Sequence, residues 1–506
     1  MTNATIMHSA GAGQAGILKA FADGKMGGVP TPADRIETHL NYIFLAGDRA
    51  YKLKRDARMP FVDFSTVEAR RAACEAELAV NRRFGSPFYL GVEPIVVQAD
   101  GALRLGGEGA VADWTVIMKR FDRAGQFDNL ARTGRLTVAL VEEAAERIAG
   151  VHAISPAVQQ AGHAADYRQV IHRLRLTETD GAGRIGLSAS HASPYDQLDA
   201  ELLRIGSLLE KRRSLGKVRR THGDLHLRNI CVFEGKATPF DALEFDERLA
   251  TTDVLYDLAF LLMDLRHNDL PRLANAAMNR YWDTASEDEE ALELLPFFMS
   301  LRAAVRMAIA VEAGQLEEAK RYRELAIALL KRAPASCIAI GGLSGSGKSA
   351  VAFELAPVLP GPAGGRILRT DVLRKRAAGL SMLERAPPAA YAPENREAIY
   401  QVLLAHSVAA RRAGASVVLD GTFASDKARD LLRSGADGKA FHCFWLEAPC
   451  DVRRARVASR IGDASDADVS VALNQQDPGG LGEGWRRVDA QRPPDAIVAQ
   501  ILEIIS

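Results

Sequence analysis

The stretch RTHGDLHLRNICVFEGKATPFDALEFDE, residues 220–247, decides the fold of the first part of the chain. It places Asp224, Asn229, Asp241 and Glu244 among apolar residues, and a short predicted hairpin lies between Asn229 and Asp241. Phosphoryl transfer needs a carboxylate near the attacking hydroxyl and oxygen ligands for Mg²⁺. The stretch therefore predicts a phosphoryl-transfer loop, with Asp241 as the main magnesium carboxylate.

The order HGDLHLRN followed by FDALEFD resembles the catalytic core of aminoglycoside phosphotransferase-like kinases, which are relatives of the protein kinases. The resemblance implies that Asp224 is the catalytic base and that Asn229 and Asp241 bind Mg²⁺. The glycine that usually follows two residues after the last aspartate is missing here. Glu244 is therefore a candidate for an additional metal or substrate contact.

The same resemblance implies a lysine on an upstream strand and a glutamate on the next helix. The segment AYKLK offers Lys52 or Lys54, which are two residues apart and so share a strand face. The segment CEAEL offers Glu75 or Glu77. We prefer Lys52 with Glu77 as the nucleotide-binding pair.

The residues around these motifs predict an α+β, bilobal, protein-kinase-like domain. Residues 36–56 alternate as a hairpin, and residues 65–84 form a helix with a Ser65–Glu68 capping box. The pattern then becomes helical from about residue 134. The predicted organisation is an N-lobe over 1–122, with further strands at 91–99 and 113–119, and a helical lobe over 123–332.

A second phosphate-binding motif, GLSGSGKS, matches the pattern G-x-x-x-x-G-K-[ST] between a predicted strand and a predicted helix. Its glycines let backbone N–H groups approach phosphates at a helix N-terminus. Lys348 is predicted to reach the β- and γ-phosphates, and Ser349 to hold Mg²⁺. The predicted nucleotide-binding residues are Gly342, Ser344, Gly345, Ser346, Gly347, Lys348 and Ser349.

Strands alternate with helices after residue 333, which predicts an α/β P-loop domain with a parallel sheet over 333–506. Asp420 ends a predicted strand, either as a magnesium residue or as an ordinary strand-end aspartate. Asp371 and Arg374 follow another strand, where they either meet the phosphate acceptor or, for Asp371, cap a helix. The predicted strands are 337–342, 366–371, 416–421 and 439–448.

Three arginines, Arg453, Arg456 and Arg460, fall on one face of a predicted helix. They resemble the arginine lid of small-molecule P-loop kinases, although a solvated basic face would have the same spacing. Residues 336–506 resemble P-loop kinases related to gluconate kinase, polynucleotide kinase and zeta-toxin kinases. The whole chain resembles bacterial proteins that fuse an aminoglycoside phosphotransferase-like domain to a P-loop domain.

Composition indicates the classes of partner and the cellular compartment. Formal net charge is zero, so no global field favours nucleic acid or membrane. Five cysteines without a CxxC pair indicate a reducing compartment and no zinc site. The N-terminal stretch lacks the pattern of a signal peptide, and we find no apolar run of the roughly 20 residues that span a bilayer. We therefore expect a cytoplasmic protein.

The sequence favours an ATP- and Mg²⁺-dependent phosphotransferase with two kinase-type sites and small-molecule hydroxyl acceptors. In one alternative the P-loop half is a regulatory ATPase or nucleotide sensor. In another, one half acts on RNA or a nucleotide, and the basic clusters at 211–213 and 218–220 bind phosphates. Aromatic residues are only 6% of the chain and do not interleave with these clusters, so a stacking platform is not expected. Neither the acceptors nor the oligomeric state follow from the sequence.

Overall fold

The computed structural model describes residues 13–31, 34–59, 62–182, 193–435, 441–459 and 464–505. The chain forms two compact units. The first unit contains Met1–Leu136, Gly150–Gly162 and Leu215–Asp257, and the second contains Thr137–Ala149, His163–Ser214 and Leu258–Ser506. This grouping differs from the three segments predicted from the sequence, because many helices of the middle segment belong to the same unit as the P-loop sheet.

A mixed-length antiparallel sheet in the order β1-β2-β3-β8-β6-β7 forms the first unit's main layer. The predicted hairpin is confirmed, since β2 pairs with β3 across a turn at Gly47. The strands are β1 (Asp34–Glu37), β2 (Asn41–Ala46), β3 (Arg49–Lys54), β6 (Tyr89–Val97), β7 (Leu103–Leu105) and β8 (Ala110–Lys119).

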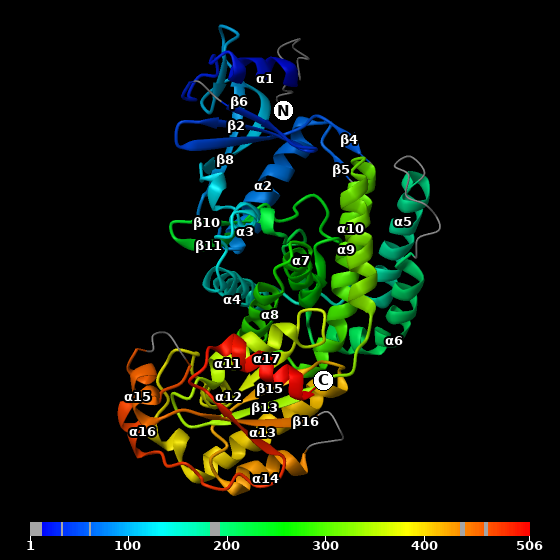
Figure 1. The fold of residues 1–506 in the computed structure, drawn as a ribbon. Helices are drawn as coiled ribbons and strands as arrows, with labels where there is room; N and C mark the ends of the chain where they lie inside the picture. The colour runs from blue at the N-terminus through cyan, green and yellow to red at the C-terminus, as the bar shows by residue number, and fades with distance from the viewer. Residues whose placement is uncertain are drawn as a thin grey trace. The chain divides into compact units, whose positions relative to one another are not determined.

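Alternation along β3 sends its side chains to opposite faces of this sheet. Tyr51 and Leu53 share a core cluster with Phe21 of helix α1 (Gln14–Ala22). Lys52 and Lys54 face the other way, toward helix α2 (Val67–Arg83), which packs against β8, β6 and β3 (Figure 1). The sheet thereby carries two lysines to the helix that supplies their carboxylate.

The N-terminus of α2 differs from the predicted capping box. Thr66, rather than Ser65, is the N-cap, and its side chain accepts a hydrogen bond from the amide of Ala69. The Ser65 hydroxyl donates instead to Asp63. Adjacent hydroxyl residues offer the same capping chemistry, and backbone geometry selects between them.

The stretch 220–247 folds as a loop and a hairpin, as predicted. The hairpin turns at Glu234 and Gly235, both of which have positive φ. The elements around it are α3 (Phe127–Arg132), β9 (Val218–Arg220), the 3₁₀ turn η2 (Leu227–Asn229), β10 (Ile230–Phe233), β11 (Lys236–Pro239) and β12 (Thr251–Asp253). Two short strands, β4 (Arg58–Met59) and β5 (Val62–Asp63), form a separate pair. A second 3₁₀ turn is η1 (Arg123–Gly125).

The predicted helical segments are confirmed. One continuous helical stretch, Glu289–Glu312, has the length and hydropathy of a membrane span, contrary to the expectation that no such run exists. Of its most apolar 18-residue window, 78% is buried inside the structure, as in a core helix. The helices are α4 (Val138–Ile154), α5 (Ala164–Ala182), α6 (Tyr195–Ser214), α7 (Val254–His267), α8 (Pro271–Ala285), η3 (Glu289–Leu294), α9 (Leu295–Glu312) and α10 (Leu316–Leu330).

The last part of the second unit is a parallel sheet in the order β14-β15-β13-β16-β17. The four predicted strands are present, although 439–440 lie outside the described residues, and β17 was not predicted. The strands are β13 (Cys337–Gly342), β14 (Arg366–Arg369), β15 (Val417–Asp420), β16 (Phe441–Glu447) and β17 (Trp485–Asp489).

Helices cover both faces of this sheet (Figure 1). Ile338 and Ile340 of β13 join the core cluster that α11 and α17 complete, whereas Cys337 meets Ser407 of α13 on the other face. The helices are α11 (Lys348–Leu355), η4 (Ala356–Val358), α12 (Thr370–Ala377), η5 (Pro388–Tyr391), α13 (Pro393–Arg412), α14 (Asp426–Ser434), α15 (Cys450–Ala458), α16 (Val469–Asn474) and α17 (Pro494–Ile505).

Helix α8 and the 3₁₀ segment η3 dock on the edge strand β14 through buried polar groups. Arg366 forms ion pairs with Asp283 and Glu289, at 2.6 Å and 3.1 Å, and donates to Asn279 at 3.0 Å. Asn279 also accepts the backbone amide of Ile367 at 2.8 Å. An otherwise open sheet edge is thus satisfied by side chains of the helical segment.

Candidate active sites

Lys52, Glu77 and Asp241, which lie far apart in sequence, meet in the first unit. The Lys52 ammonium is 2.7 Å from Glu77 Oε1 and 2.5 Å from Asp241 Oδ1. Lys52 and Glu77 are buried, whereas Glu75 is exposed and pairs with Arg71. The structure thus favours Glu77 over Glu75.

In this cluster, ion pairing shifts the pKa values of Glu77 and Lys52 more than burial does. Burial by itself raises the pKa of a carboxyl group, but Lys52 and Lys54 lower the pKa of Glu77 to about 2. Burial likewise opposes the charge on Lys52, yet Asp241 and Glu77 raise its pKa well above the usual value. Lys52 is therefore a permanent cation, which is what binding of nucleotide phosphates requires.

Asp224 and Asn229 also lie together, at the loop formed by the HGD motif. The Nδ2 atom of Asn229 donates to Asp224 Oδ2 and to the Asp224 carbonyl, both at 2.9 Å. With Nδ2 committed in this way, Oδ1 is the atom of Asn229 that can bind a cation. The Asp224 side chain is 40% exposed, so a substrate hydroxyl can reach it.

Asp257 braces this loop from beneath. Its carboxylate accepts the backbone amides of His222 and Gly223 at 3.1 Å and 2.7 Å, and it also contacts His152. The His222 ring bonds the Phe240 carbonyl at 2.9 Å, and burial lowers its pKa. His222 and Asp257 thus support the loop through buried contacts.

Asp241 adopts an unusual backbone conformation. Its φ of 59° lies in the left-handed region, which costs roughly 1–2 kcal/mol for a residue other than glycine. Its side chain is 42% exposed and its Oδ1 lies against Lys52. The Asp241 carboxylate offers a hard oxygen ligand for Mg²⁺, and the neighbouring Lys52 offers a cation for phosphate. Together they suit a magnesium-bound nucleotide.

Glu244 is buried and faces Lys54. Its side chain is 7% exposed and pairs with Lys54, which is fully buried and also bonds Glu77 Oε2 at 2.6 Å. The sequence had left Lys52 and Lys54 as alternatives. In the structure both lysines bond Glu77, one at each carboxylate oxygen, but only Lys52 reaches Asp241.

The second site is a cavity of about 950 Å³ in the second unit, bordered by the P-loop. Helix α11 begins at Lys348, whose ammonium donates to the Leu343 carbonyl at 3.0 Å. Gly345 has φ 83°, and a Cβ atom there would lie 2.3 Å from the Arg453 carbonyl oxygen. The loop can therefore follow this path only with glycine at that position.

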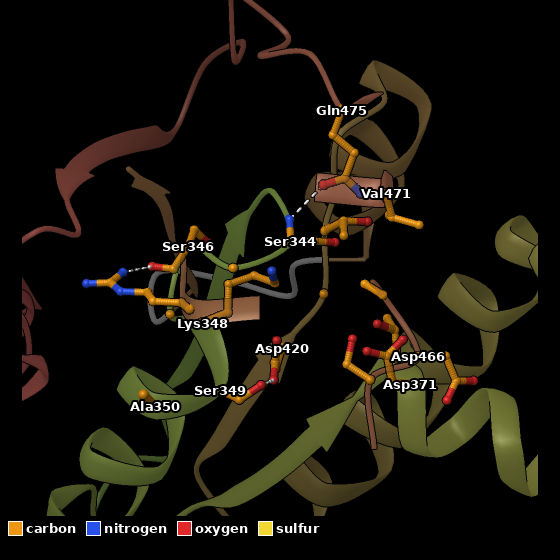
Figure 2. A pocket seen from close by; sticks show the side chains of 18 of the residues that line it. Ser344, Ser346, Lys348, Ser349, Ala350, Asp371, Asp420, Asp466, Val471 and Gln475 are labelled. Carbon is orange, nitrogen blue, oxygen red and sulfur yellow. Dashed lines mark hydrogen bonds between the residues drawn. The ribbon is translucent and has the colours of Figure 1, made fainter. Parts of the chain in front are cut away.

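Ser349 and Asp420 meet at the floor of the cavity. Ser349 Oγ donates to Asp420 Oδ2 at 2.6 Å, as Figure 2 shows. Arg369 lies against both, 3.2 Å from Ser349 Oγ and 3.3 Å from Asp420 Oδ2. Two adjacent hard oxygen atoms fit Mg²⁺. The Arg369 guanidinium already pairs with the same Asp420 oxygen, so a metal ion would have to replace that contact.

Asp371 and Arg374 border the same cavity and pair with each other at 2.5 Å. Asp371 lies in the first turn of α12, but the bond that its carboxylate makes is to Arg374. Arg374 also stacks over the Tyr391 ring at 4.6 Å. The pair therefore lies at the cavity, with the Asp371 carboxylate held by the Arg374 guanidinium.

The three arginines of the expected lid do not act alike. Arg453 is buried beneath the P-loop, where its guanidinium donates to the carbonyls of Ala472 and Ser344. Arg456 borders the cavity and donates to the Ser346 carbonyl at 3.2 Å. Arg453 thus supports the loop from below instead of closing over phosphate, and Arg460 lies outside the described residues.

Two cavity residues were missed by the sequence reasoning. Gln475 accepts the amide of Ser344 at 2.7 Å, in the place where a phosphate oxygen could bind (Figure 2). Asp466 pairs with Lys375 at 2.9 Å and accepts the Tyr391 hydroxyl at 2.7 Å. Gln475, which precedes a second glutamine, and one aspartate within an acidic run carry no recognisable spacing.

Metal binding at both sites would rely on few protein ligands. In the part of the chain that the structure describes, no cluster of three or more His, Cys, Asp or Glu could hold a metal ion. Mg²⁺ in phosphoryl-transfer sites usually takes one or two carboxylates and completes its shell with water and phosphate. Asn229 with Asp241, and Ser349 with Asp420, fit that pattern.

Comparisons with known proteins agree with this arrangement. Residues 101–294 match the model of the phosphotransferase enzyme family, and residues 337–477 match an AAA domain. Uncharacterized proteins of Mycobacterium tuberculosis and Mycobacterium bovis are each 27% identical over 488 residues, covering 92% of this chain and 94% of theirs.

Several solved structures of kinases are similar to part of this chain. A choline/ethanolamine kinase family protein from Mesorhizobium loti is 13% identical, covers 63% of this chain and 98% of its own, and has a TM-score of 0.39. A gluconokinase from Sinorhizobium meliloti is 23% identical, covers 35% and 97%, and has a TM-score of 0.25. By the two family-model matches, the chain is a kinase-type enzyme with one segment similar to the phosphotransferase enzyme family and another similar to an AAA domain.

Proposed function

We propose that the chain is a phosphotransferase that uses Mg²⁺-ATP at two separate active sites and acts on small-molecule hydroxyl acceptors. The observation that carries this proposal is the meeting of Lys52, Glu77 and Asp241, drawn from three distant segments, beside a catalytic-type loop. The P-loop cavity adds a second complete set of groups. We retain 1–122, 123–332 and 333–506 as the proposed domains and a cytoplasmic location as a prediction.

At the first site each residue has a separate task. Asp224 would accept the proton of the acceptor hydroxyl, and its bond from Asn229 fixes the carboxylate for that role. Lys52 would hold nucleotide phosphates, with Glu77 keeping it charged and oriented. Mg²⁺, when bound at Asn229 and Asp241, would neutralise charge on the transferred phosphoryl group.

At the second site backbone amides replace part of that machinery. The P-loop amides and Lys348 would hold the β- and γ-phosphates at the N-terminus of α11. Ser349 and Asp420 would hold Mg²⁺ or its water shell. Asp371 and Arg374, across the same cavity, would orient the acceptor hydroxyl and stabilise charge on the phosphoryl group.

A regulatory ATPase is the second candidate for the P-loop half. It is favoured by Gln475, which already occupies the Ser344 amide, and by Arg369, which already pairs with Asp420. Such contacts suit a loop that responds to nucleotide. ATP hydrolysis that no added acceptor stimulates would support this candidate.

A role in RNA binding is less well supported. In the cluster at 211–213, Lys211, Arg212 and Arg213 each pair with a glutamate. Arg219 and Arg220 donate to backbone carbonyls. Side chains already neutralised or bonded in this way offer little charge to a phosphate backbone.

The test is a screen of sugars, aminoglycosides and nucleosides with labelled ATP, using wild type, Asp224→Asn and Lys348→Ala. Each variant should lose a different phosphorylated product, because each removes one site's chemistry. Glu75→Gln is the control, since Glu75 is exposed and pairs only with a surface arginine. If both variants give the wild-type set of products, the proposal of two active sites fails.

A further inference from the structure

Lys54 is a fully buried cation for which the proposed chemistry has no use. Its ammonium lies 2.6 Å from Glu77 Oε2, pairs with Glu244, and sits 5.7 Å from the centre of the Phe64 ring. A buried charge is tolerated only when partners compensate for its lost hydration. Lys54 therefore depends on two carboxylates, one on α2 and one on the segment that carries Asp241.

That segment, 241–244, is anchored at every residue. The anchors come from β6, α2, the HGD loop and β3, and all are within the first unit. They are the Tyr89 hydroxyl, which accepts the Asp241 amide at 3.3 Å; Asn81 Oδ1, which accepts the Ala242 amide at 3.0 Å; the His222 carbonyl, which accepts the Leu243 amide at 2.9 Å; and Lys54, which donates to the Glu244 carboxylate.

Three of these anchors are ordinary hydrogen bonds to the backbone, and the fourth is a charge pair at the end of the segment. Asp241 needs such support because its φ of 59° is unfavourable for an aspartate. The conformation persists only if the surroundings hold it.

We propose that Lys54 and Glu244 are positioning residues, which hold the 241–244 segment so that the Asp241 carboxylate stays beside Lys52. The inference rests on the proposed kinase function of the first site. It removes Glu244 from the candidate metal and substrate contacts. Glu77 then has two roles, since one carboxylate oxygen orients Lys52 and the other orients Lys54.

The first test uses Glu244→Gln, which keeps the size of the side chain and removes its charge. Hydrogen–deuterium exchange of the nucleotide-free protein should be faster at the amides of 241–244 than in wild type. This readout needs no bound nucleotide and no catalysis. Glu75→Gln is again the matched control, because it changes an exposed glutamate on α2 and should leave the exchange unaltered.

The second test measures binding of AMP-PNP with and without Mg²⁺, in a Lys348→Ala background so that binding reports the first site. Residues that orient metal ligands typically contribute about 10- to 100-fold to metal affinity. Glu244→Gln should therefore weaken binding with Mg²⁺ by roughly that factor and leave metal-free binding nearly unchanged. Lys54→Met should have the same signature.

Unchanged exchange at 241–244 together with unchanged Mg²⁺-linked affinity in Glu244→Gln would overturn the inference. If that variant does not fold, Glu244→Asp keeps the charge but shortens the side chain, and intermediate exchange and affinity are expected. Wild-type values for Glu244→Asp would also count against the proposal. Failure of wild type to bind nucleotide at the first site would instead refute the kinase function, whatever the exchange result.

Discussion

Arg366 is the residue whose replacement should most weaken the second unit. Its guanidinium is 1% exposed and bonds Asp283, Glu289 and Asn279. Replacement by methionine keeps much of the volume but leaves two carboxylates, Asp283 and Glu289, without their cation. Removing one partner of a buried ion pair costs about 3–5 kcal/mol, so Arg366→Met should lower the free energy of unfolding by that amount.

The assay is urea unfolding followed by tryptophan fluorescence. Trp282 lies in α8 beside the Arg366 network, and Trp445 lies in the P-loop sheet, and both are buried. The matched control is Arg272→Met. Arg272 also joins α8 to the P-loop region, through Glu354, but it is 59% exposed, so its loss should cost less than about 1 kcal/mol.

The pH dependence of stability offers a second test of the Arg366 ion pairs. Burial would raise the pKa of Glu289, but Arg366 and His406 lower it below the usual value of 4.5. A carboxyl with a lowered pKa stabilises the fold above pH 4.5 and loses that contribution as pH falls. The difference between wild type and Arg366→Met should therefore shrink below pH 4.5. A cost equal to that of Arg272→Met at neutral pH would refute the reasoning.

Two further predictions concern the active sites. Gln475→Ala should tighten ADP binding at the P-loop by roughly 2- to 10-fold in calorimetry. The reason is that nucleotide must displace the hydrogen bond between Gln475 and Ser344, which is worth about 0.5–1.5 kcal/mol. Weaker binding would mean that Gln475 contacts the nucleotide. At the first site, the pKa of Glu77 is lowered to about 2, so the first unit should lose stability as pH falls from 4.5 toward 2. Chemical unfolding followed by hydrogen exchange in β3 and α2 checks this, and Glu77→Gln should reduce the pH dependence in that range.

Much of the fold and of both sites could be predicted because local motifs carry them. HGD, the spaced Asn229 and the P-loop each specify a backbone shape as well as a chemistry. The order of strands and helices then fixed the parallel sheet. Strand β17 was not predicted from the sequence because WRRVD mixes charged with apolar residues. Such a mixture is expected at a sheet edge, where one side is solvated.

The rest depended on tertiary contacts that spacing does not encode. Lys52 and Lys54 share a strand face, so only packing against α2 and the Asp241 segment separates their roles. Arg453 has the spacing of a lid residue, yet α15 turns it beneath the P-loop. Periodicity identifies a helix face but not what that face meets.

The two proposed sites differ physically in how they present positive charge. In the first, Lys52 is buried between carboxylates, so its charge and position are set before any nucleotide arrives. In the second, the Ser344 amide already donates to Gln475 (Figure 2). The Lys348 ammonium already donates to the Leu343 carbonyl. Nucleotide must break those bonds at the second site, whereas at the first it gains a cation held in place by Glu77. The first site therefore depends on preorganised side chains and the second on exchange of hydrogen-bond partners, so nucleotide should alter local structure mainly around the P-loop.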